Sequence, residues 1–167
     1  MIDEFVAQPG VTSSLQWNIH SWNPFEVDSD EKGFVLNRDE SRLRGYFMFS
    51  HEGFVTLTEG WDPPLNLMKS AAQWHNQYHL RFTPTDYAAK RNLGVVLCPG
   101  YPGQPAAEVR RERIGDAELA VIGDARVAVN QGEAMEVDGR RIDAVAAVLI
   151  GDRFYRIESG GISRDSS

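Results

Sequence analysis

The stretch FVLNRDESRLRGYFMFSHEGFVTLT, residues 34–58, decides the fold that we expect. Apolar and aromatic side chains fill three short runs, at 34–36, 43–49 and 54–58, and polar turns separate the runs. Runs of this length, rich in Val, Phe and Thr and bounded by Asp, Ser and Gly, are typical of β-strands. The stretch therefore predicts a three-stranded antiparallel meander.

The middle run, 43–49, is apolar on both faces, which predicts a central strand that is covered on both sides. We expect a helix to cover one face. The other cover is either the N-terminal segment around Trp17 and Trp22 or a partner chain.

The covering helix is expected at residues 65–81, which contain no Gly or Pro. Asp62 is a good N-cap, and Pro63-Pro64 suit a first turn that needs no backbone N–H. Thr83-Pro84 ends the helix, because the residue before a proline disfavours the helical conformation. At the helical period, six side chains fall within about a third of the circumference. They are Met68, Ala71, Ala72, His75, His79 and Phe82.

Weaker helical signals lie on either side of this block. Residues 2–7 are expected to form one or two helical turns before the Pro9-Gly10 break. A second short helix is expected at 87–92, stopped by Gly94.

The second half of the chain is expected to be a set of β-hairpins. A strand at 95–97 leads into a loop, 98–105, that Pro and Gly interrupt. Beyond this loop Ile-Gly-Asp occurs three times, and glycine in such a turn supplies the positive φ that tight hairpins require. The three copies are at 114–116, 122–124 and 150–152.

These signals predict one α+β domain over residues 1–167. The sheet is mostly antiparallel, a meander plus C-terminal hairpins, and one main helix packs on it. Residues 1–32 are a mixed N-terminal segment, and residues 159–167 are expected to be a flexible tail.

The charge balance argues against two classes of partner. With 24 acidic and 17 basic residues, the net charge of −7 is the wrong sign for a nucleic-acid backbone. No apolar run approaches the ~20 residues of a membrane span, and the acidic start is unlike a signal peptide. We therefore expect a cytoplasmic protein whose partner, if it has one, is a basic protein.

No motif announces catalysis, so we expect no enzyme, no cofactor and no metal. His75 and His79 are spaced to share a helix face, but a metal site needs a third ligand, and the alternative is two side chains at the edge of the core. Cys98 follows an apolar strand and precedes Pro99-Gly100, which favours an inert thiol over a nucleophile. A small hydrolase or isomerase with a His–carboxylate pair remains a third reading.

Aromatic side chains are the strongest hint of a binding surface. The Pro/Gly-rich loop at 98–105 presents Tyr101 on a stiff scaffold that can anchor an interface, although the simpler interpretation is an ordinary connection between two halves. The partner-binding residues that we predict are Tyr101, Gln104, Trp22 and Trp61.

The block at residues 34–94, about a third of the chain, contains a characteristic order of segments: Phe34-Val-Leu-Asn-Arg38, Arg42 to Phe49, Gly53 to Thr58, Ala71-Ala72, Tyr78 and Lys90-Arg91. In this order the block resembles the actinobacterial family of immunity factors that neutralise secreted necrotizing toxins, which degrade NAD. The resemblance implies an antitoxin without catalytic residues, which occludes the active site of its cognate toxin in a one-to-one complex.

The alternative function is a small-ligand-binding domain. Its aromatic pocket would lie between the helix at 65–81 and the sheet, with His75, Tyr78 and His79 as lining residues.

Overall fold

The structure is a computed structural model in which all secondary structure of the described residues is β. It describes residues 1–10, 15–30, 32–48, 52–60, 76–85, 90–101, 103–105, 107–115, 117–130, 132, 134–137, 139–158 and 161–164. This part of the chain contains no helix, and thus none of the length and apolar character that crossing a bilayer demands.

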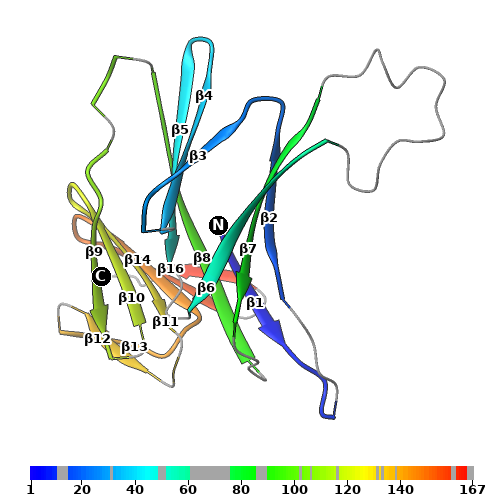
Figure 1. Cartoon of the computed structure of the whole chain (residues 1–167). Helices are drawn as coiled ribbons and strands as arrows, with labels where there is room; N and C mark the ends of the chain where they lie inside the picture. The colour runs from blue at the N-terminus through cyan, green and yellow to red at the C-terminus, as the bar shows by residue number, and fades with distance from the viewer. Residues whose placement is uncertain are drawn as a thin grey trace.

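The strands form three layers and a small covering hairpin, with antiparallel pairing throughout (Figure 1). The middle layer is a five-stranded sheet in the order β1 (Ile2–Val6), β8 (Lys90–Gly100), β5 (Ser41–Met48), β4 (Gly33–Arg38), β3 (Phe25–Val27). A three-stranded sheet covers one face, in the order β2 (Trp17–Ser21), β7 (Tyr78–Pro84), β6 (Gly53–Glu59).

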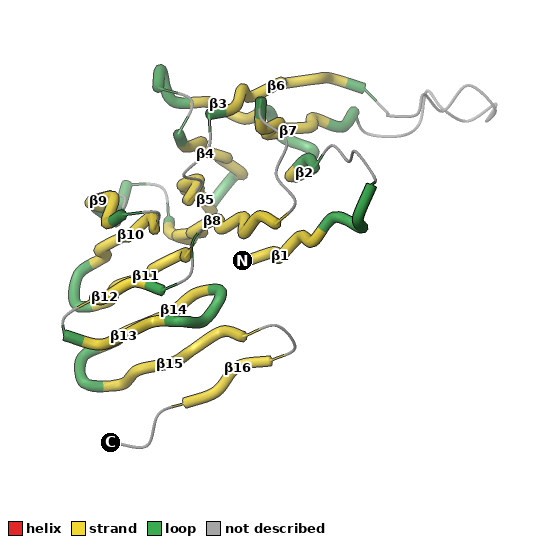
Figure 2. The backbone as a smooth tube through the Cα atoms, turned by 90° about the horizontal axis from the view of Figure 1, so that it is seen from below, coloured by secondary structure: helices red, strands yellow, loops and turns green. Residues whose placement is uncertain are grey.

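The third layer is a six-stranded sheet, which Figure 2 shows extending away from the other two toward the C-terminus. Its order is β16 (Gly161–Arg164), β15 (Arg153–Glu158), β14 (Ala146–Ile150), β11 (Ala125–Asn130), β10 (Ala117–Ile122), β9 (Arg110–Ile114). The hairpin of β12 (Met135–Val137) and β13 (Arg140–Ile142) covers its outer face.

An aromatic core joins the three-stranded sheet to the five-stranded sheet. The rings of Trp17 and Phe47 meet edge to face with centroids 5.6 Å apart, and Phe34 is fully buried beside them. Aromatic pairs in this arrangement contribute beyond the area that they bury. The buried members are Trp17, Phe25, Phe34, Phe47, Leu80, Phe82, Leu93 and Val95.

A second core of smaller side chains joins the five-stranded sheet to the six-stranded sheet. Met48 on β5 is fully buried against this sheet, whereas its neighbour Phe47 faces the aromatic core. β5 is therefore apolar on both faces because it is the middle of three layers, as the sequence predicted. The buried members are Met48, Ala120, Val129 and Ala146.

A β-sheet, instead of the predicted helix, covers one face of β5. The α+β class with one main helix is wrong, because residues 78–81 of the predicted helix lie in β7; residues 65–75 lie outside the described residues. Leu80 and Phe82 point into the aromatic core at the strand period of two. The segment around Trp17, the other cover that we considered, is part of the three-stranded sheet.

The strand predictions are confirmed at 34–36 and 43–48, which form the β4–β5 hairpin. The meander itself is wrong, because β6 pairs with β7 in a different sheet from β5. In the second half, the hairpins expected at the three Ile-Gly-Asp copies are confirmed, because the strands on either side of each copy are paired: β9 with β10, β10 with β11 and β14 with β15.

Three further predictions are wrong, those for the N-terminal turns, for the second short helix and for the C-terminal tail. Residues 2–6 form β1 instead of helical turns, because they pair with β8. Residues 90–92 belong to β8, and the rest of the predicted short helix, from 87 to 89, lies outside the described residues. The expected tail contains β16, which pairs with β15.

Candidate functional site

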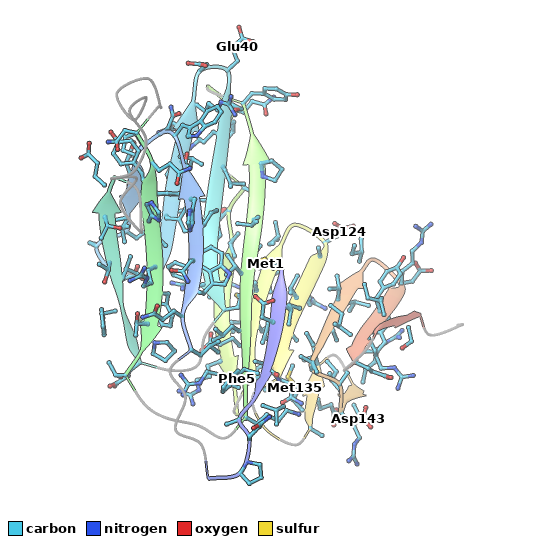
Figure 3. The ribbon with its side chains drawn as sticks, turned by 90° about the vertical axis from the view of Figure 1, so that its right-hand side faces the viewer. Met1, Phe5, Glu40, Asp124, Met135 and Asp143 are labelled. Carbon is cyan, nitrogen blue, oxygen red and sulfur yellow. The ribbon has the colours of Figure 1, made fainter. Side chains whose placement is uncertain are left out.

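The end of the five-stranded sheet at the β4–β5 turn carries the site candidates. Arg38 and Ser41 are the last pair of the hairpin, and the Ser41 hydroxyl donates to the carbonyl oxygen of Arg38 at 3.0 Å. Figure 3 labels Glu40 at the tip of this turn, far from Phe5 and Asp143 at the opposite end. Because Arg42 pairs with Gly100, Tyr101 follows directly beside the turn. We call Trp22, residues 38–41, Tyr101 and Gln104 the aromatic end.

Two large aromatic side chains are exposed at the aromatic end. Trp22 is 60% exposed and Tyr101 is 66% exposed. The guanidinium carbon of Arg38 lies 5.9 Å from the centre of the Trp22 ring, within cation–π range. Contacts of this kind hold an arginine and a tryptophan together on a surface.

The loop after β8 is tied into a turn. The backbone N–H of Gln104 donates to the carbonyl oxygen of Tyr101 at 3.2 Å, and Gly103 has a φ of 82°. A positive φ at the third position is what a type II turn requires, and glycine adopts it without strain. Tyr101 is therefore displayed from a closed turn, while the preceding residues 98–100, expected to be loop, extend β8.

A cleft of about 330 Å³ opens beside Trp22. It combines rings, two side-chain amides, one aliphatic side chain and a guanidinium group. Its lining residues are His20, Ser21, Trp22, Asn23, Leu36, Arg38 and Gln77. They come from β2, β4, the segment after β2 and the segment before β7.

A histidine pair lies at the base of this region. His20 on β2 and His79 on β7 are cross-strand partners, with ring centroids 4.2 Å apart. His79 is buried, and its Nε2 lies 2.8 Å from the carbonyl oxygen of Gly60. A carbonyl only accepts, so Nε2 carries the proton and donates, which fixes the His79 ring in place.

The described residues contain no group of three His, Cys, Asp or Glu side chains that could hold a metal ion. Cys98 is half-buried on β8, and burial raises the pKa of its thiol, although the charge of Arg44 acts in the opposite direction. A nucleophilic cysteine needs a lowered pKa, so the geometry favours an inert thiol.

The structure places three of the four predicted partner-binding residues, Trp22, Tyr101 and Gln104, at the same end of the five-stranded sheet. Trp61 lies outside the described residues, as does His75. The pocket predicted against a helix is not formed by Tyr78 and His79, because both lie in β7.

Sequence reasoning missed the partners that complete the cleft, above all His20, Leu36 and Arg38. Arg38 is followed by Asp39 and Glu40, and a charged turn of this kind is normally only a solvated surface. Its place beside Trp22 depends on the pairing of β3 with β4, which no local signal reveals.

No protein-family model matches the chain, and no curated protein matches it.

Proposed function

We propose that the chain is an immunity protein that binds a cognate secreted toxin, one that degrades NAD, through the aromatic end. It acts in the cytoplasm, as a one-to-one complex that covers the active site of the toxin. The proposal combines the resemblance of residues 34–94 to immunity factors with one structural observation. Trp22, Arg38 and Tyr101 are gathered at one end of the central sheet.

The residue types support a protein-binding surface. Trp, Tyr and Arg are the side chains that most often dominate binding energy at protein interfaces. Trp22 and Tyr101 are each more than half exposed, so contact with a partner would remove apolar area from water.

The scaffold supports tight binding because it holds these side chains in place. Arg38 ends β4, which pairs with β5, and β5 is buried on both faces. Tyr101 begins a turn closed by its hydrogen bond with Gln104. A surface that is already ordered loses less conformational entropy when a partner binds.

The net charge of −7 fits a basic partner. Opposite net charges speed the encounter of two proteins, and the effect falls as salt increases. Asp39 and Glu40, both exposed on the β4–β5 turn, add negative charge at the proposed contact.

The test is affinity purification of the tagged full chain from its native background, followed by identification of what co-purifies and measurement of the mass of the complex. A secreted toxin in one-to-one ratio, whose activity is lost in the complex, is the expected result. A chain that elutes alone, or a toxin that stays active when bound, would contradict the proposal.

A further inference from the structure

The cleft beside Trp22 differs in charge from the rest of the molecule. Of the described residues that line it, one is a cation, Arg38, and none is a carboxylate. This is unusual for a chain with 24 acidic and 17 basic residues. A guanidinium group in the wall of a cleft favours a ligand that places its negative charge against it.

Arg38 is available for a ligand. No ion pair that joins two described residues involves it. By contrast, Arg44 forms an ion pair with Asp28 on the same sheet. A guanidinium group recognises carboxylate and phosphate groups through paired N–H donors.

The remaining lining residues favour a flat organic group over a bare inorganic ion. Trp22 carries an indole ring, and Leu36 carries an aliphatic side chain. Asn23 and Gln77 add side-chain amides that can donate to an anionic oxygen.

The cleft volume of about 330 Å³ limits the size of the ligand. Small-molecule sites run from about 300 to 1,000 Å³, so this cleft lies at the small end. It suits a single ring with one charged substituent.

We propose that this cleft binds a small organic anion, a planar ring that carries one carboxylate or phosphate group. The anionic group lies against Arg38, and the ring lies between Trp22 and Leu36. This inference goes beyond the proposed toxin binding and stands without it, because the cleft needs no partner chain.

Binding can be measured on the purified full chain by calorimetry or by NMR of the indole N–H groups. Benzoate and phenyl phosphate are the probes, and benzamide is the neutral match to benzoate. We expect at least one anion to bind about tenfold tighter than benzamide, since a hydrogen-bonded charge is worth this much or more. Comparison of the two anions distinguishes a carboxylate site from a phosphate site.

Two variants test the residues. Arg38→Gln removes the charge and should weaken the better anion about tenfold, while Arg153→Gln, the same change on exposed Arg153 of β15, should leave it unchanged. Trp22→Leu should weaken anion and benzamide alike, because both use the ring. A cooperative thermal unfolding transition verifies that each variant is folded.

The inference is overturned if neither anion binds, if benzamide binds as tightly as both anions, or if Arg38→Gln retains the wild-type affinity. Tyr101→Ala separates it from the proposed function. Tyr101 is outside the cleft lining, so this variant should keep anion binding while it loses the partner.

Discussion

Gly94 lies where β8 of the middle sheet contacts the six-stranded sheet. A Cβ at this position would be 2.6 Å from the Cγ2 atom of Val129 and 3.1 Å from the Cβ of Met48. The absence of a side chain is therefore what lets the two sheets approach.

We expect Gly94→Ala to destabilise the protein by about 1–3 kcal/mol, the usual cost of overpacking a core. Urea unfolding monitored by tryptophan fluorescence measures the change. Gly100→Ala is the control on the same strand, because its Cβ would meet nothing within 4 Å. Equal stability of the two variants would contradict the close approach of the sheets.

The carboxyl group of Glu118 on β10 makes the stability of the fold depend on pH in a predictable direction. Burial raises the pKa of its carboxyl, and the charges of Arg113 and Arg111 offset this only in part. The charged form is therefore less favourable in the folded state than in the unfolded chain. This cost is present at neutral pH and disappears as the pH falls through the raised folded pKa toward the unfolded value of about 4.3.

We expect Glu118→Gln to stabilise the protein slightly at pH 7 and to have no such benefit near pH 4, as measured by urea unfolding at both values. Glu136→Gln, which removes an exposed carboxylate on β12, is the control. A Glu118→Gln protein that is less stable than wild type at pH 7 would show that the carboxylate makes a favourable contact there.

The hairpins of the six-stranded sheet are the elements that the sequence predicts best. Gly123 lies between the paired residues Ile122 and Ala125 with a φ of 59°, and Gly151 takes the same place after Ile150 with a φ of 58°. A two-residue turn that begins with such a glycine is a preferred hairpin connection. The glycine that marks each turn lies within the hairpin itself, so the sequence alone predicts the hairpin.

We expect Gly123→Val to cost about 1–2 kcal/mol, because a side chain disfavours this left-handed conformation. Thermal or urea unfolding measures the loss. Asp124→Ala, at the exposed neighbour, should change stability far less. Unchanged stability in both variants would contradict a positive φ at Gly123.

The segment at 78–82 shows why the predicted helix is wrong. His79 and Phe82 are three apart and fit a helical stripe, yet Leu80 and Phe82 are two apart and fit a strand. A segment of five residues is too short to distinguish the helical period from the strand period. The pairing of β7 with β2 and β6 decides for the strand, and these neighbours lie more than 15 positions away at Trp17–Ser21 and Gly53–Glu59.

The stacking of three sheets could be predicted only in part. Apolar residues on both faces of 43–49 correctly indicated a central strand. Nothing local indicated that β1 pairs with β8, or that β6 leaves the meander for another sheet, because strand pairing between distant segments leaves no signature in either strand.

The candidate site could also be predicted only in part. Exposed aromatic residues in Pro/Gly-rich or Asn-Pro segments, Tyr101 and Trp22, could be singled out by their composition. The arrangement that joins them with Arg38 depends on three strand pairs, β3–β4, β4–β5 and β5–β8, and only the second was predicted.

The central claim is that the aromatic end binds the partner. The most direct test compares the affinity of wild type, Trp22→Ala, Tyr101→Ala and Ile162→Ala for the co-purified toxin by calorimetry. Ile162 is 74% exposed on β16, the outer strand of the six-stranded sheet, so it controls for loss of any large exposed side chain. The account predicts losses of about 2 kcal/mol, or roughly 30-fold, for Trp22→Ala and Tyr101→Ala and wild-type affinity for Ile162→Ala. Wild-type affinity in both aromatic variants would contradict it.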